Sequence, residues 1–103
     1  MTRLELVMTY TSVLHRLSLP PTHALAILLL AGRTQGLTRA EMRTLSGLSE
    51  RSCRRILETL ASEGRARISY DGHHQHGGNS RRIYHLTEDG ETLARELLAH
   101  SAQ

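Results

Sequence analysis

The chain has 103 residues, a formal net charge of +3 with neutral histidines, three Tyr, and no Phe or Trp. This length fits one domain with a modest core, which must be built from aliphatic side chains, as is typical of packed helices more than of a sheet sandwich. The single Cys53 excludes an intrachain disulfide, and the longest apolar run, 24–31, is too short to span a membrane, so we expect a cytoplasmic protein without a membrane partner.

Two helices are predicted in the first third of the chain. Residues 3–17 carry apolar side chains at helical spacing, namely Leu4, Val7, Met8, Tyr10, Leu14 and Leu17. The segment 18–21 interrupts this pattern because neither Pro20 nor Pro21 continues a preceding helix. A second helix is expected from about Pro21, where the missing N–H costs nothing, to near Gly32.

A helix, a tight turn and a second helix follow. Thr38 and the acid three residues later have capping-box spacing, which predicts a helix over 39–45 with Met42 and Leu45 facing inward. The turn 46–48 contains a glycine, and Ser49 then caps a helix over 50–63 that ends at Gly64. Its inward face comprises Cys53, Ile56, Leu57 and Leu60, and its outward face comprises Arg51, Arg54, Arg55 and Glu58.

After Gly64 the spacing of the apolar residues changes from helical to alternating. Alternation over 66–70 and 82–86 predicts a two-stranded hairpin with a long polar tip, and Thr87 caps a last helix over 88–100. The expected fold is a mainly α winged helix in the order α-α-α-α-β-β-α. We expect a single domain over 1–103, with an N-terminal helix at 1–17, a winged-helix core at 21–86 and a C-terminal helix at 87–103.

The central helices predict a helix-turn-helix whose second helix enters a DNA major groove. Between Arg33 and Arg82 there are ten Arg and five acidic residues, whereas the flanks hold three Arg and five acidic residues. A basic middle favours a polyanion, although a solvated helix face gives the same count. Arg pairs bidentately with guanine, and Arg81 and Arg82 follow the hairpin tip, where they would meet phosphates. The predicted DNA-contacting residues are Thr38, Arg39, Ser49, Glu50, Arg51, Ser52, Arg54, Arg55, Arg81 and Arg82.

Two motifs resemble a known group of proteins. LSLPPTHALAILLLAG followed by LTRAEMRTLSGLSERSCRRILETLASEG resembles the winged-helix core of MarR-type regulators. GGNSRRIYHLTEDGETL is similar to the wing and following helix of PadR-type regulators, with Tyr84, Leu86, Thr87 and Gly90 in their pattern. The resemblance covers about 17–98 and implies a bacterial transcription regulator, a homodimer joined through terminal helices, and a reading helix that begins at Ser49. The final predicted helix is shorter than the dimerising helices of many such proteins.

Two further residue groups have alternative interpretations. His73, His74 and His76 suit a transition metal, but no Cys or carboxylate completes a site, so we favour a flexible wing tip and expect no metal or other cofactor. Cys53 lies near a helix N-terminus beside Arg54, which favours a reactive thiolate. Its inward position favours a small core residue instead.

The leading hypothesis is a sequence-specific transcription regulator that binds double-stranded DNA and acts as a dimeric repressor. We expect the helix over 3–17 and the last helix to pair with their counterparts in a symmetric dimer. The alternative is a winged helix used for protein contact, or a phage or plasmid accessory factor without sequence-specific reading. The sequence has no phosphate loop, no nucleophile elbow and no paired carboxylates in an apolar setting, so we expect no enzyme and no catalytic residue.

Overall fold

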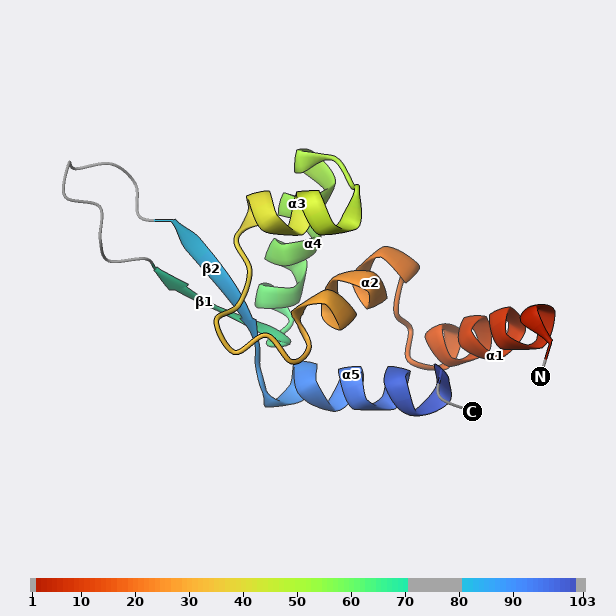
Figure 1. The fold of residues 1–103 in the computed structure, drawn as a ribbon. Coiled ribbons are helices and arrows are strands. Elements are labelled where there is room, and N and C mark those ends of the chain that lie inside the picture. The colour runs from red at the N-terminus through yellow and green to blue at the C-terminus, as the bar shows by residue number, and fades with distance from the viewer. Residues whose placement is uncertain (1, 71–80, 102–103) are drawn as a thin grey trace, which may run out of the picture.

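The computed structural model describes residues 2–70 and 81–101. The helices and strands follow the predicted order α-α-α-α-β-β-α, which confirms the winged-helix fold (Figure 1). Their bounds are α1 Arg3–Arg16, α2 Pro21–Leu30, α3 Arg39–Ser46, α4 Glu50–Ser62, β1 Ala66–Tyr70, β2 Arg82–Leu86 and α5 Glu88–Ser101.

The predicted caps set the bounds of the two central helices. The Thr38 hydroxyl accepts from the Glu41 N–H at 3.2 Å while the Glu41 carboxylate accepts from the Thr38 N–H at 3.0 Å, which completes the capping box of α3. Gly47 ends α3 in the left-handed region, with φ of 73°. The Ser49 hydroxyl then accepts from the Ser52 N–H at 3.1 Å and starts α4. Local chemistry therefore fixes the helix-turn-helix.

One predicted core position in this motif is wrong. Met42 is buried, but Leu45 is 46% exposed. Leu45 lies about 60° around the helix axis from Met42, and at the angle at which α3 crosses its neighbours it lines an open hollow together with Arg33 and Leu37. Leu48, in the turn, is half-buried and packs against the core.

The hairpin joins the helical core through a third backbone segment. β1 and β2 pair in antiparallel register from Ala66 opposite Leu86 to Tyr70 opposite Arg82. Leu37, just before α3, donates its N–H to the Tyr84 carbonyl at 3.0 Å and accepts from the Tyr84 N–H at 2.8 Å. The wing therefore lies in a fixed position beside the start of α3.

The α5 helix starts at a joint with the end of α4. The Thr87 hydroxyl accepts from the Gly90 N–H at 3.2 Å and donates to the Gly64 carbonyl at 2.6 Å. A Cβ at Gly90 would overlap the Arg65 carbonyl, so the close approach requires glycine here. These contacts hold the first turn of α5 against the base of the wing.

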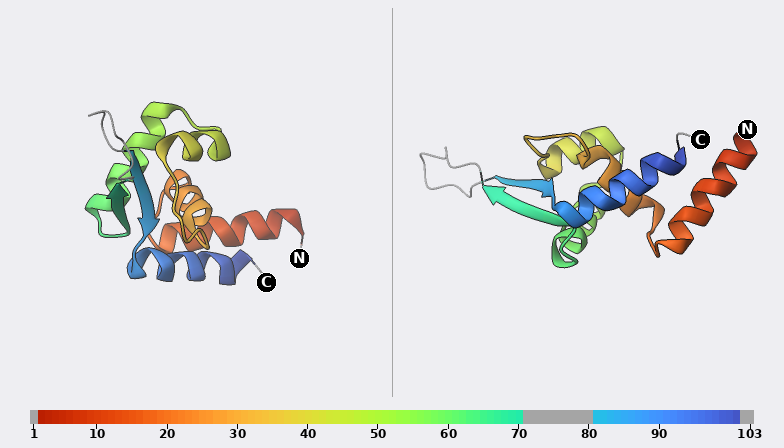
Figure 2. Two further views of the ribbon diagram at one scale, coloured as in Figure 1. Left: turned by 60° about the vertical axis from the view of Figure 1, so that its left-hand side comes forward. Right: turned by 90° about the horizontal axis from the view of Figure 1, so that it is seen from below.

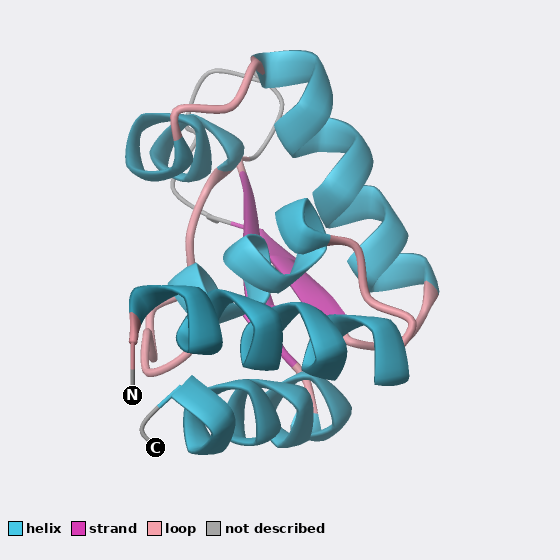
Figure 3. Cartoon of the chain, turned by 90° about the vertical axis from the view of Figure 1, so that its right-hand side faces the viewer, coloured by secondary structure: helices cyan, strands magenta, loops and turns pink. Residues whose placement is uncertain are grey.

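The terminal helices form a layer of their own beneath the helix-turn-helix. α5 packs against α1 and α2 (Figures 2 and 3). The buried part of α1 is confined to its C-terminal half, at Val13 and Leu14, whereas Leu4, Val7 and Met8 are exposed. Within the described residues no single helix is long and apolar enough to cross a membrane, and the pair α1 and α2, which together would be, bends by 94° at its break.

Candidate nucleic-acid interface

A groove of about 930 Å³ lies between the helix-turn-helix and the wing. Three parts of the chain supply its walls: α3 with its cap, the outer face of α4, and the ends of the two strands. Six predicted contact residues line it, namely Thr38, Arg39, Glu50, Arg54, Arg81 and Arg82. Four additional residues line it without having been predicted, namely Ala40, Arg43, Glu58 and Tyr70.

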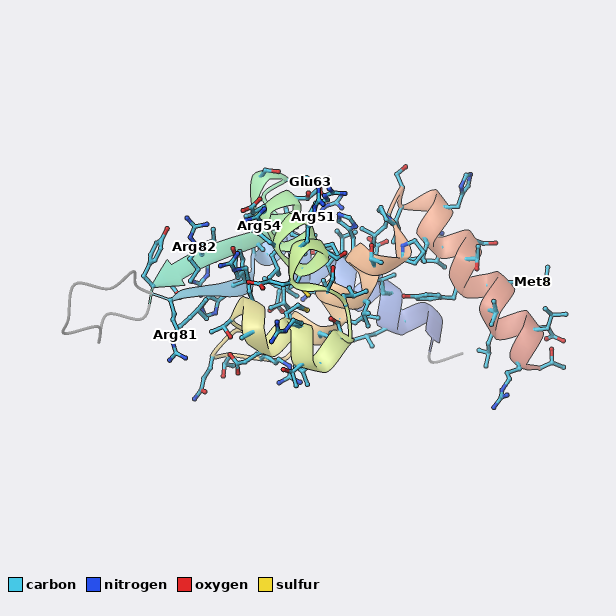
Figure 4. All side chains as sticks on the ribbon, turned by 90° about the horizontal axis from the view of Figure 1, so that it is seen from above. Met8, Arg51, Arg54, Glu63, Arg81 and Arg82 are labelled. Atoms are coloured by element: carbon cyan, nitrogen blue, oxygen red, sulfur yellow. The ribbon has the colours of Figure 1, made fainter. Side chains whose placement is uncertain are left out.

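The face of α4 that lines the groove follows from helical spacing. Glu50, Arg54 and Glu58 are four residues apart, so they lie one above the other on the same stripe. Arg51 and Arg55 are exposed but do not line the groove. Figure 4 shows Arg54 on α4 with Arg82 and Arg81 on the wing side, whereas Met8 lies at the far end of the molecule.

Two predicted contact residues are occupied by the helix cap. Besides accepting from the Ser52 backbone, the Ser49 hydroxyl donates to the Ser52 hydroxyl at 3.0 Å. The pair thus starts α4 and lies outside the groove lining. Their predicted role in DNA contact stays a prediction.

The strand residues reach the groove because strand side chains alternate between two faces. Tyr84 and its partner Ile68 face the core, so Arg82 and its partner Tyr70, two residues further out, share that inward face. Here the hairpin extends beyond the core, and both side chains are exposed over the groove. Arg67 is exposed on the opposite face.

The Glu41 carboxylate in the first turn of α3 is stabilised in its ionised form by the cap and by nearby arginines. Hydrogen bonds from the Thr38 backbone and side chain lower the pKa of Glu41 below its usual value, and the charges of Arg81 and Arg33 lower it further. This carboxylate therefore stays ionised and keeps the cap formed. Arg81 also lines the same groove as Thr38 and Arg39, at the start of α3.

The groove has a basic lining. It contains five arginines and two glutamates, and Arg43 lies 4.0 Å from Glu50, so one acid is partly neutralised by an exposed ion pair across the turn. Arg39 and Arg43 are four residues apart on α3, a spacing that the sequence already contained as a signal. Such a lining attracts an anion.

The remaining candidate residues do not form a site in the described part of the chain. Cys53 is buried, with its Sγ 3.7 Å from the Ser46 hydroxyl and 4.0 Å from the Leu48 carbonyl, which supports a core role. His73, His74 and His76 lie outside the described residues. Over 2–70 and 81–101, no cluster of three or more His, Cys, Asp or Glu is arranged to hold a metal.

Comparison with solved structures bears on the fold. A mutant of S. aureus MepR bound to oligodeoxyribonucleotide has a TM-score of 0.81 at 17% identity, over 92% of this chain and 67% of that one. NadR in complex with 4-hydroxyphenylacetate has a TM-score of 0.80 at 21% sequence identity, over 96% of this chain and 67% of that one. A MarR-family transcriptional regulator from Rhodococcus sp. RHA1 has a TM-score of 0.76 at 14% sequence identity, over 94% of this chain and 66% of that one.

The chain has the winged-helix fold of MarR-family proteins. It spans about two thirds of the length of these solved structures. No protein-family model matches the chain, and no curated protein matches it. The resemblance of the wing to PadR-type regulators therefore stays a prediction.

Proposed function

We propose that this chain is a sequence-specific, double-stranded DNA-binding transcription regulator that acts in the cytoplasm as a dimeric repressor. The observation that carries the proposal is the arginine-lined groove between α4 and the wing. The mutant MepR structure, which shares the fold, is bound to an oligodeoxyribonucleotide. A basic groove beside an exposed helix-turn-helix matches the shape and the charge of a DNA backbone.

In the proposed complex α4 enters the major groove with its N-terminal half. Arg54 faces the groove and Arg51 and Arg55 are exposed beside it, so their guanidinium groups are available to guanine edges or phosphates. Glu50 lies in the first turn of α4, where a carboxylate accepts from the cytosine amino group. These side chains would supply the sequence dependence.

The wing and the start of α3 would fix the position of the backbone. Arg81 and Arg82 on the wing and Arg39 in the first turn of α3 border the same groove. These cationic side chains favour phosphate. Contacts of this kind add affinity for any duplex.

The terminal segments 1–17 and 87–103 would join two copies, leaving 21–86 to bind DNA. Leu4, Val7 and Met8 on α1 and Leu98 on α5 are exposed apolar residues on the layer away from the groove. A symmetric dimer would cover them and place two reading helices about 34 Å apart. A pseudo-palindromic site follows from that symmetry.

Duplex binding tests the interface directly. The triple variant R51A/R54A/R55A should lose binding to duplexes selected from genomic fragments, measured by fluorescence anisotropy. The matched control R33A/R65A/R67A removes the same charge from positions outside both the groove lining and the terminal segments and should retain most affinity. If wild type binds no duplex even at low salt, the proposal fails and the protein-contact alternative is favoured.

Sedimentation tests the dimer separately. M8E places a charge on the exposed apolar part of α1, so it should shift the protein to monomer and weaken binding to a two-half-site duplex. S62E adds the same charge at the exposed end of α4 and should leave the dimer intact. A wild-type protein that sediments only as monomer at micromolar concentration would contradict this part of the proposal.

A further inference from the structure

Tyr70 stands apart from the other two tyrosines of the chain. Tyr84 is fully buried and Tyr10 packs against the core, whereas Tyr70 is 60% exposed at the end of β1. The sequence has no Phe or Trp, so aromatic groups are scarce and the other two serve the core. Packing therefore does not account for an aromatic ring at this position.

The strand register places Tyr70 over the groove. It lies directly opposite Arg82, and both residues continue the inward face on which Ile68 and Tyr84 pack. Cross-strand neighbours on one face lie about 5 Å apart at their Cβ atoms, close enough for a ring to lie beside a guanidinium group. Tyr70 and Arg82 both line the groove, with Arg54 on the opposite wall.

We infer that Tyr70 is a further DNA-contacting residue, whose phenol hydroxyl donates a hydrogen bond to a backbone phosphate of the DNA strand that lies in the groove. This inference rests on the proposed function and adds one residue and one ligand atom to it. A phenol is a neutral donor, so it contributes a hydrogen bond without adding charge. Hydroxyl contacts of this kind fix the position of the backbone and carry no base information.

The choice of phosphate over a base follows from the position of Tyr70. The residue lies on the wing, beside the arginine that we assign to phosphate, and not on the reading helix. The two carboxylates of the lining, Glu50 and Glu58, come from α4. A phosphate on the wing side would therefore contact Tyr70, Arg81 and Arg82, and no carboxylate of the lining comes from the wing to repel it.

The test uses the full chain and the variant Y70F, which keeps the ring and removes only the hydroxyl. Loss of one hydrogen bond to a charged group should weaken binding about 10- to 150-fold, equally for a selected duplex and for an unrelated duplex. The dependence of log affinity on log salt should keep its slope because no charge is lost. The control Y84F removes the hydroxyl of a fully buried tyrosine outside the groove lining and should bind as wild type.

Each outcome separates the inference from the proposed function. Wild-type affinity in Y70F, with R54A weakened, would overturn the inference and leave the proposed function standing. A loss confined to the selected duplex would also overturn it, because a base contact would then be responsible. Absence of any duplex binding by wild type would reject the proposed function itself. Equal melting temperatures of Y70F and wild type would exclude unfolding as the cause of a loss.

Discussion

Leu37 and Tyr84 exchange two backbone hydrogen bonds, of 3.0 and 2.8 Å, and this pair fastens the wing to the segment that leads into α3. Both residues are buried, so water does not compete for these bonds. The pair sets how far β2 lies from the start of α3. The width of the basic groove depends on it.

Gly36 makes this pairing possible, and its replacement should cost more than that of an ordinary turn glycine. Gly36 and Gly47 share a φ of 73°, but a Cβ at Gly36 would lie 2.6 Å from the Tyr84 carbonyl oxygen, while one at Gly47 meets nothing within 4 Å. We expect Gly47→Ala to lose about 1 kcal/mol of unfolding free energy and Gly36→Ala about 3 kcal/mol. Denaturant unfolding of both variants measures the difference, and equal losses would show that the contact is unimportant.

The two faces of the hairpin should respond differently to loss of an arginine. Arg82 lines the groove and Arg67 is exposed on the other face. If Arg82 neutralises one phosphate, Arg82→Ala should reduce the slope of log affinity against log salt by about 0.9, whereas Arg67→Ala should leave it unchanged. Titration of one duplex at four salt concentrations gives both slopes. A slope that falls with Arg67→Ala and not with Arg82→Ala would place the DNA backbone on the opposite face of the hairpin and contradict the prediction.

The buried hydroxyl of Tyr84 should be dispensable for stability. Its oxygen has no hydrogen-bond partner among the described residues although the side chain is fully buried. Burial of an unpaired hydroxyl is unfavourable, so Tyr84→Phe should keep or raise the unfolding free energy by up to about 1 kcal/mol. Thermal and urea unfolding check this expectation. A clear loss of stability would show that the hydroxyl is hydrogen-bonded in solution.

His85 should make the fold sensitive to mild acid. Burial lowers the pKa of His85 below its ordinary value of 6.5, and the charge of Arg67 lowers it further. The unfolded chain then binds more protons than the folded one, so stability is lost as pH falls from about 6.5 through the folded-state pKa and is regained above.

The variant His85→Gln isolates this effect because glutamine retains a polar group toward Ser69, whose hydroxyl lies 2.8 Å from His85 Nε2. Its unfolding free energy should fall less than that of wild type between pH 7.5 and pH 5.5. The control His15→Gln alters an exposed histidine on α1 and should reproduce the wild-type profile. Identical profiles for all three proteins would remove His85 as the source.

Local chemistry made most of the fold predictable. The caps at Thr38, Ser49 and Thr87 and the glycines that follow the helices act within a few residues, so the sequence alone places the ends of these elements. The inward position of Leu45 was wrong because it depends on the angle at which α3 crosses its neighbours, which no local spacing reports.

The groove was predictable only in part for a related reason. Its arginines follow from a helix-turn-helix and from helical periodicity. Tyr70 depends on the register of β1 against β2, and that register is set across a long tip and by the bridge between Leu37 and Tyr84. Such a non-local pairing leaves no short pattern in the sequence.

The hydrogen bond from the Thr87 hydroxyl to the Gly64 carbonyl joins residues 23 positions apart in the chain. The bond therefore closes the chain into a ring at the base of the hairpin, between the end of α4 and the start of α5. The distance between the end of α4 and the start of α5 is thus set at the base of the hairpin and does not depend on its outer end.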